Sequence, residues 1–217
     1  MDYTSTKLRR YLESLKSNGL QLKETQEEYR LEKQGGEVLF SLLMIAATTP
    51  EGEHFRRLAM VRGHFVSILT LLKARETGEE YLVLVGQRRV ATGGIIWEHP
   101  AGMLDEATDP AAVAVKELAE ETGLVAKPEE LVLLDQELVY SSPGLLDEGG
   151  YFFCLERDLP LAEIEQLEGK HTGAATENES IRLTVVPFSE AMEKIGNVNG
   201  RYHIYRYMAH KHSPKRR

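Results

Sequence analysis

Three glutamates in the middle of the chain, Glu117, Glu120 and Glu121, are spaced three and four residues apart. On an α-helix this spacing stacks their carboxylates on one face. Like charges placed in this way repel one another, which destabilises a helix by a few tenths of a kcal/mol per pair, roughly. A hard divalent cation such as Mg²⁺ would turn the repulsion into coordination, because it prefers carboxylate oxygens and shares them with substrate phosphates. The spacing therefore indicates metal-assisted phosphate chemistry.

Isolated glutamate pairs are often only a solvated helix surface, but the flanking residues here predict a helix with defined ends. Asp109 and Pro110 are typical of a helix start, a capping side chain followed by a ring that pre-sets the first turn. Gly123 is typical of the left-handed residue that ends a helix. The tight turn 100–102 lies just upstream. The opposite, core-facing stripe is predicted to consist of Ala111, Ala114 and Leu118.

These residues resemble the signature of the Nudix hydrolases, Gly-x5-Glu-x7-Arg-Glu-U-x-Glu-Glu-x-Gly-U, where U is a bulky apolar residue. The matching positions are Gly102, Glu117, Leu118, Glu120, Glu121, Gly123 and Leu124. Two positions depart, since Thr108 stands where the pattern has its first Glu and Lys116 where it has Arg. Lysine keeps the positive charge but loses the planar fork that holds a carboxylate bidentately. We expect both changes to weaken the support of the metal site without abolishing it.

Other segments narrow the resemblance to the ADP-ribose and ADP-sugar pyrophosphatases. Residues 98–102 are similar to the Glu-Leu-Pro-Ala-Gly that opens the motif in that group, and 142–148 resemble its Ser-Pro-Gly-Gly-x-x-Glu loop. The likeness covers roughly residues 63–210 and favours nucleoside diphosphate sugars over nucleoside triphosphates as substrates. Further similar segments are 87–89, 166–173 and 177–187.

The resemblance implies roles for individual residues. Glu117, Glu121 and the backbone carbonyl of Ala101 are expected to hold the metal, with Glu120 completing or tuning the cluster as a catalytic residue. Mg²⁺ is the expected ion, and Mn²⁺ is an alternative. The expected substrate contacts are Arg89, Glu98 and Gly144. None of the seven histidines is assigned to metal, and His99 is expected to shape the loop.

The group that deprotonates the attacking water has three candidates. Glu177 aligns with the acid that similar ADP-ribose enzymes carry on a mobile loop, and residues 169–179 have the Gly/Thr-rich, acidic character of such a loop. Glu148, which follows the Ser-Pro-Gly turn, competes for the role, and Glu179 is the third candidate.

The resemblance predicts a Mg²⁺-dependent hydrolase that splits a nucleoside diphosphate sugar into a nucleoside monophosphate and a sugar phosphate. ADP-ribose or ADP-glucose is favoured, and a GDP- or UDP-sugar is the alternative inside the class. The rival from another class is a nucleotide-sugar sensor that binds without turnover, which the departures at Thr108 and Lys116 keep open.

Composition limits the other classes of function. The formal net charge of −8 argues against non-specific binding to nucleic acid or to an anionic membrane. No apolar run approaches the roughly 18 residues of a membrane span. The single cysteine, Cys154, lies in an apolar run and is expected to be a buried strand residue. With no signal peptide recognised, these features predict a cytoplasmic protein.

The pattern along the chain predicts an α/β fold, a Nudix-type α/β/α sandwich with a mixed sheet and an N-terminal β-rich extension. One or two short helices are expected within 6–30, and a hairpin within 37–61 whose turn is 48–52. Paired strands are expected at 65–72 and 81–86. Further strands are predicted near 131–140, 150–156 and 181–186, and helices at 160–169, 189–195 and 202–212.

The expected organisation is an N-terminal extension at 1–62, a hydrolase domain at 63–212 and a basic tail at 213–217. In similar ADP-sugar enzymes such an extension packs against a second subunit. The apolar strand 38–47 is expected to leave an exposed edge in a monomer, so we predict a homodimer formed through this region.

Overall fold

The computed structural model describes residues 5–33, 35–173 and 180–212. The chain forms two compact units, and neither is a continuous stretch of sequence. The first unit comprises Met1–Phe65, Met103–Thr108 and Leu138–Gly150. The second comprises Val66–Gly102, Asp109–Glu137 and Tyr151–Arg217.

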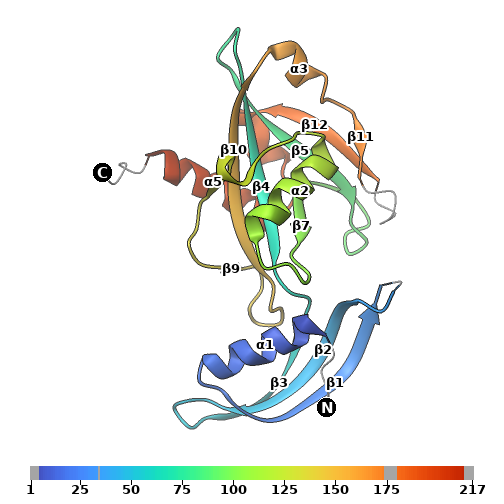
Figure 1. Ribbon diagram of the computed structural model, residues 1–217, viewed down its shortest axis with the longest axis vertical. Helices are drawn as coiled ribbons and strands as arrows, with labels where there is room; N and C mark the ends of the chain where they lie inside the picture. The colour runs from blue at the N-terminus through green and yellow to red at the C-terminus, as the bar shows by residue number, and fades with distance from the viewer. Residues whose placement is uncertain (1–4, 34, 174–179, 213–217) are drawn as a thin grey trace. The chain divides into compact units, whose positions relative to one another are not determined.

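The first unit consists of one helix on a three-stranded antiparallel sheet in the order β1-β2-β3 (Figure 1). Helix α1 is amphipathic, and its buried Leu8 and Leu12 belong to one core cluster with Leu43, Ile45 and Val61 of the sheet. The elements are α1 (Thr6–Ser17), β1 (Gln21–Glu32), β2 (Val38–Thr48) and β3 (His54–Val61).

The predicted hairpin at 37–61 is confirmed, because β2 and β3 pair from Ser41↔Val61 to Thr48↔His54. Of the one or two short helices expected within 6–30, the structure has one, α1 (Thr6–Ser17). Gln21–Glu32 forms β1, which pairs with β2 although its leucines and tyrosine recur at near-helical spacing. Strand pairing has overridden the local pattern, and register irregularities in β1 have blurred the alternation that would reveal a strand.

The predicted exposed edge on residues 38–47 is also wrong. β2 is the central strand, so both of its edges are hydrogen-bonded to neighbours. The edges of this sheet are β1 and β3. Along β3, Met60 N–H donates to Leu145 O (2.7 Å) and Met60 O accepts from Asp147 N–H (3.2 Å), so one end of that edge is covered within the same unit.

The second unit is built on a sheet in the order β11-β12-β5-β4-β10-β8, with β6 pairing β5 and β7 pairing β4. Of its central strands, β4 is almost completely buried and β5 is buried over residues 82–86, and both have apolar runs there. The strands of this sheet are β4 (Phe65–Ala74), β5 (Glu80–Arg88), β6 (Ile95–Glu98), β7 (Ala101–Met103), β8 (Val132–Leu133), β10 (Gly149–Leu159), β11 (His171–Thr172) and β12 (Ile181–Pro187). The short strand β9 (Val139–Tyr140) pairs with the first residues of β10 and belongs to the first unit.

Helices pack on both faces of this sheet. Leu82 and Leu84 of β5 lie in a cluster with Ala191 and Ile204, whereas the alternating Val83 and Val85 lie in another cluster with Ile164. The predicted α/β/α sandwich with a mixed sheet is confirmed. The helices are α2 (Pro110–Thr122), the 3-10 turn η1 (Pro128–Glu130), α3 (Leu161–Glu165), α4 (Phe188–Lys194) and α5 (Val198–His212).

Two predicted elements are shorter than expected. Residues 131–140 contain only the two-residue strands β8 and β9, and the helix expected at 160–169 spans Leu161–Glu165. The paired strands at 65–72 and 81–86 are confirmed. Cys154 lies on β10 and is 2% exposed, as predicted.

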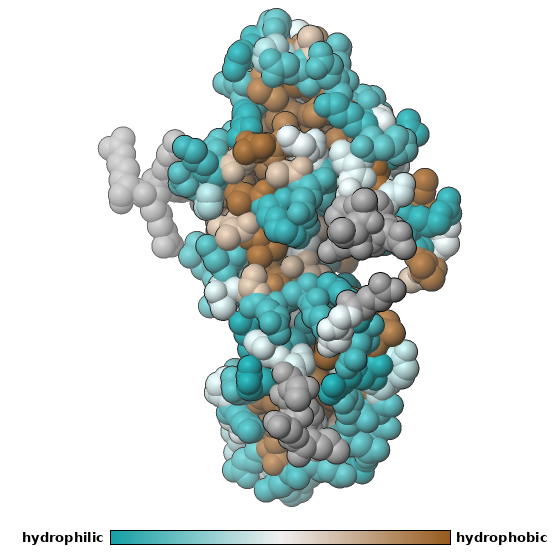
Figure 2. Space-filling model, turned by 45° about the vertical axis from the view of Figure 1, so that its right-hand side comes forward, coloured by the Kyte–Doolittle hydropathy of each residue, from teal (hydrophilic) through white to brown (hydrophobic). Residues whose placement is uncertain are grey.

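Hydrophilic residues cover most of the face seen in Figure 2, with hydrophobic residues scattered among them. Among the described helices, none combines the length and the apolar character that a bilayer crossing requires.

Two histidines are buried in the second unit. His203 Nε2 donates to Phe153 O (2.9 Å), and its Nδ1 accepts from the Ser67 hydroxyl (3.1 Å). The ring of His99 lies edge-on to that of His203, with centroids 4.8 Å apart, and His99 Nε2 donates to Gly200 O (3.3 Å). Burial lowers the pKa of His99 to about 4, and burial together with His99 lowers the pKa of His203 well below its usual range.

This pair predicts acid lability of the fold. Unfolded histidines titrate near 6.5, so between about pH 6.5 and 4 the unfolded chain binds protons that the folded chain does not. The free energy of unfolding should therefore be highest, as far as these two histidines determine it, above pH 6.5. It should fall by about 1.4 kcal/mol per pH unit for each buried histidine as the pH is lowered. Urea denaturation at pH 7.5 and 5.5 measures the slope.

The matched variants are H203Q, in which the amide can still donate to Phe153 O, and H210Q at an exposed site on the same helix. We expect H203Q to reduce the pH slope and H210Q to leave it unchanged. If the pH dependence of the free energy of unfolding is unchanged in H203Q, the acid lability does not come from His203.

Candidate active site

Helix α2 has the ends that the sequence predicts. Asp109 Oδ1 accepts from the N–H groups of Ala111 (3.0 Å) and Ala112 (3.3 Å), and Pro110 occupies the first helical position. Gly123 ends the helix in the left-handed conformation (φ 77°) and donates to Ala119 O. These caps fix where the helix starts and ends, and so where its glutamates point.

Two of the three glutamates meet β7, the short strand that precedes the helix in sequence. Glu121 is 7% exposed, and its Oε2 accepts from Ala101 N–H at 2.9 Å. Glu117 packs directly on the Gly102 backbone, where a Cβ atom would come within 2.5 Å of Glu117 Oε1. A side chain at position 102 would displace this carboxylate, so glycine is required by the close approach.

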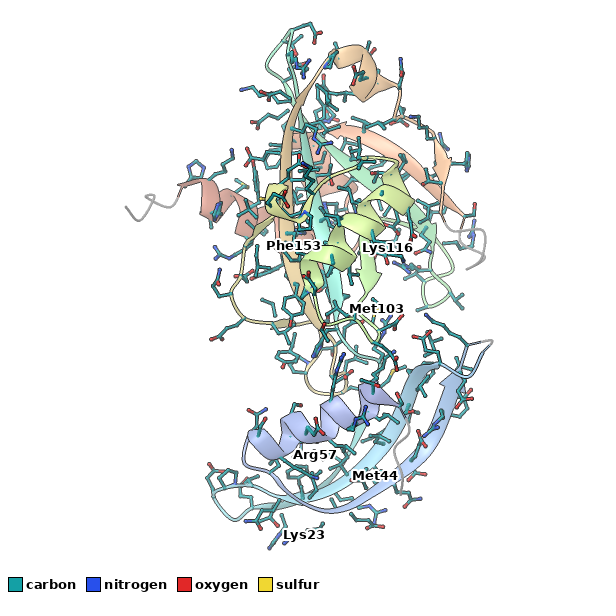
Figure 3. All side chains as sticks on the ribbon, viewed as in Figure 1. Lys23, Met44, Arg57, Met103, Lys116 and Phe153 are labelled. Carbon is teal, nitrogen blue, oxygen red and sulfur yellow. The ribbon has the colours of Figure 1, made fainter. Side chains whose placement is uncertain are left out.

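The third glutamate points toward solvent. The side chain of Glu120 is 41% exposed, and its Oε2 lies 3.0 Å from Lys116 Nζ, which is also 3.5 Å from Glu117 Oε1. Figure 3 labels Lys116 on α2. Its hydrogen bond to Glu120, aided by the charge of Glu117, raises the pKa of Lys116. Lys116 thus keeps a positive charge beside both carboxylates at the position where the motif has arginine.

A further contact, not anticipated from the sequence, holds the C-terminal end of α2. The Thr172 hydroxyl donates to the backbone carbonyl of Glu121 at 2.5 Å. Thr172 lies on β11, which pairs with β12 through Thr172↔Ile181. The last turn of the helix is therefore tied to a strand about fifty residues further along the chain.

Arg89 and Glu98, both expected to contact substrate, are paired with each other. The Nε (2.8 Å) and Nη2 (2.5 Å) atoms of Arg89 both donate to Glu98 Oε2. Glu98 Oε1 accepts from Asn197 Nδ2 at 2.6 Å. The side chain of Glu98 is 13% exposed and that of Arg89 48%, so the arginine is the member of the pair that a ligand could reach.

The remaining candidates belong to the first unit or lie outside the described residues. Glu148 and Gly144 belong to the first unit, where Glu148 is 8% exposed and 2.6 Å from Arg62 Nη1. A Cβ at Gly144 would meet no atom within 4 Å. Glu177 and Glu179, the other candidate bases, lie outside the described residues. Their roles stay predictions.

The donor atoms of this site are of the kind that a hard divalent cation prefers. Glu117 and Glu121 offer carboxylate oxygens beside the backbone of residues 101–102, and Mg²⁺ prefers oxygen ligands. Within the described ranges no group of three or more His, Cys, Asp or Glu side chains is gathered as a metal cluster. In this arrangement Lys116 supplies the positive charge beside Glu117 and Glu120.

Comparison with known proteins matches residues 63–208 to the model of the NUDIX domain. Nudix hydrolase 14, chloroplastic, of Arabidopsis thaliana is 36% identical over 151 residues, which cover 66% of this chain and 48% of that protein. GDP-mannose pyrophosphatase of Cronobacter sakazakii is 34% identical over 154 residues, 68% of this chain and 73% of that protein. ADP-ribose pyrophosphatase of Bacillus subtilis is 29% identical over 146 residues, with 67% and 70% covered.

The chain therefore belongs to the Nudix family, as its motif predicts. Its fold is similar to that in the crystal structure of an ADP compounds hydrolase, with a TM-score of 0.62 and 14% identity over 87% of this chain and 92% of that one. At this identity the likeness concerns the fold alone. The matched part spans about half the length of the Arabidopsis protein and 56% of putative nudix hydrolase 2 of Caenorhabditis elegans.

The contact between Glu117 and Gly102 predicts the effect of a single methyl group. G102A should force the Glu117 carboxylate away from the loop, which costs about 1–3 kcal/mol of folding stability for an overpacked site. It should also weaken divalent-ion binding by roughly 10–100-fold. Thermal unfolding with and without Mg²⁺ measures both effects.

The matched control is G94A, because a Cβ there would approach only Thr92 Oγ1, at 3.9 Å. G94A should leave both quantities unchanged. Wild-type ion binding in G102A would show that Glu117 does not bind metal at this loop.

Proposed function

We propose that this protein hydrolyses the diphosphate bond of a nucleoside diphosphate sugar to give a nucleoside monophosphate and a sugar phosphate. The observation that carries the proposal is the convergence of Glu117 and Glu121 on the backbone of residues 101–102, in a chain of the Nudix family. Relatives named ADP-ribose pyrophosphatase and GDP-mannose pyrophosphatase support this substrate class. ADP-ribose or ADP-glucose is our leading substrate, and a GDP- or UDP-sugar is the alternative.

The ligands proposed for the ion are Glu117, Glu121 and the carbonyl of Ala101, with Glu120 completing or tuning the cluster. Mg²⁺ is proposed as the ion, since Nudix hydrolases generally use divalent metal ions. A bound divalent cation neutralises charge on the phosphoryl oxygens and orients the diphosphate. Lys116 lies beside two of these acids and offsets their repulsion before the ion binds.

Hydrolysis requires a water oxygen to bond to one phosphorus while the bond from that phosphorus to the bridging oxygen breaks. The bridging oxygen leaves with the second phosphate, and the proton of the water passes to a base. Glu177 is the proposed base, and Glu148 and Glu179 are the alternatives. Arg89 presents a guanidinium to the diphosphate, because its planar fork suits phosphate oxygens.

Product analysis by mass spectrometry in ¹⁸O-water tests the proposal. The protein is incubated with Mg²⁺ and ADP-ribose, ADP-glucose, GDP-mannose, UDP-glucose, NADH and an oxidised nucleoside triphosphate. We expect nucleoside monophosphate and sugar phosphate from one of the sugar nucleotides, with the label on the phosphorus attacked by water. E121Q should lower kcat/KM by about 100-fold or more, because it weakens charge stabilisation at the diphosphate.

The matched control for E121Q is E129Q, which makes the same change at an exposed position of the same unit. E129Q should retain wild-type activity. Near-normal turnover in E121Q would remove the metal assignment. Binding of a nucleotide sugar with no turnover across the whole panel would select the sensor instead.

We also propose that the protein forms a homodimer through its first unit, and that it acts in the cytoplasm. Cross-strand partners point to the same face of a sheet. The face of the sheet that points away from α1 is therefore identified by the pairs Tyr29↔Leu42, Leu31↔Phe40, Met44↔Leu58 and Leu42↔Met60. These pairs are apolar, and Tyr29 (50%) and Leu58 (39%) are exposed. The same face also carries Gln26 and the ion pair of Arg56 with Glu24. Burial of such a face against a second copy is favourable, at about 25 cal/mol per Å² of apolar surface.

Light scattering in solution tests the dimer. The wild-type protein should have twice the 24.5 kDa mass of the chain, and L58K should shift it toward the monomer because a lysine ammonium would be buried unpaired. E51K, an exposed change in the turn between β2 and β3, is the control and should stay dimeric. A wild-type monomer at micromolar concentration would overturn the proposal.

A further inference from the structure

The segment between α4 and α5 is hydrogen-bonded to β6, the strand that precedes β7 with its Ala101 and Gly102. Gly196 N–H donates to Trp97 O at 3.1 Å, and Asn197 Nδ2 donates to Glu98 Oε1 at 2.6 Å. The close fit at Gly196 leaves no room for a side chain without a shift, since a Cβ there would lie 3.0 Å from Ile96 Cγ2. The chain about one hundred residues downstream thus fixes the end of β6.

Both ends of the Asn197 amide are used. Asn197 directly precedes α5, and its Oδ1 accepts from Gly200 N–H at 2.9 Å, as an N-cap side chain does. A backbone N–H can only donate and a carboxylate can only accept, so the NH₂ group must face Glu98. A Cβ at Gly200 would come within 2.5 Å of Asn197 Oδ1, which explains the glycine three residues after the asparagine.

Glu98, held by Asn197, in turn holds Arg89. One carboxylate oxygen of Glu98 is held by Asn197, and the other accepts two N–H groups of the arginine. With both oxygens engaged, the carboxylate is held in place, and the two N–H groups that meet its Oε2 restrict the orientation of the guanidinium. The largely exposed side chain of Arg89 keeps further N–H groups for a ligand.

We propose that Asn197 is a positioning residue for substrate binding, acting through Glu98 to orient Arg89 toward the diphosphate oxygens of a nucleotide sugar. The proposal rests on the proposed function for the identity of the ligand. The hydrogen-bonded chain from Asn197 through Glu98 to Arg89 is independent of it.

The variant N197D separates the two uses of the side chain. Aspartate caps a helix about as well as asparagine, so the start of α5 should survive. Its carboxylate cannot donate to Glu98 and repels it. In the double variant N197D/E98Q the polarity of the bond is reversed, since the NH₂ group of the introduced glutamine donates to the introduced aspartate, while the glutamine oxygen accepts from Arg89.

The first readout does not depend on activity. Hydrogen exchange at Arg89 Nε, followed by NMR, should be slow in the wild-type protein, about tenfold faster in N197D and slow again in N197D/E98Q. The second readout is kinetic. KM for the nucleotide sugar should rise about tenfold in N197D with kcat nearly unchanged, and should recover in the double variant.

The matched control is V198D, which adds the same charge at a neighbouring side chain that is 72% exposed and leaves the hydrogen bonds intact. It should behave as the wild type in both readouts. An increase in KM in V198D equal to that in N197D would reduce the effect to long-range charge and overturn the proposal.

Unchanged exchange at Arg89 Nε in N197D would also overturn the proposal, as would a fall in kcat and KM together without rescue. If exchange responds as expected while the wild-type protein neither binds nor hydrolyses any nucleotide sugar, the proposed function fails and the positioning of Arg89 stands.

Discussion

The hydrogen bond from Ala101 N–H to the buried carboxylate of Glu121 is the constraint on which the site depends. A carboxylate that is 7% exposed is costly unless it is hydrogen-bonded, so this bond fixes β7 to the last turns of α2. Thr172 holds the backbone of the same residue through its carbonyl. Glu117 can then pack on Gly102, and two acids meet one stretch of backbone.

Much of this arrangement could be predicted from the sequence because it is encoded locally. The start and end of α2 follow from Asp109, Pro110 and Gly123, whose capping preferences act within one turn of helix. The glutamate spacing places Glu117 and Glu121 on adjoining turns, and the hairpin of β2 and β3 follows from two apolar runs around a turn. Each inference needs only neighbouring residues.

What could not be predicted depends on partners that are remote in the chain. β1 has a helix-like pattern but becomes a strand because β2 is available to pair with it. The sequence predicts an exposed edge on β2, which β1 covers. It gives no sign that Asn197 and Arg89 occupy the two carboxylate oxygens of Glu98, whose contact with substrate stays a prediction. The local sequence indicates only that Asn197 can cap the start of a helix, since a glycine follows it three residues later.

The proposed metal site is tested most directly by locating where a divalent ion binds. Mn²⁺, a paramagnetic substitute for Mg²⁺, is titrated into ¹⁵N-labelled protein, and the broadening of backbone amide signals is mapped. The account predicts that the signals of Ala101, Gly102 and the last turn of α2 around Glu121 broaden first. Broadening that starts elsewhere and spares Ala101 and Gly102 of β7 would contradict the assignment of this strand and helix as the metal site.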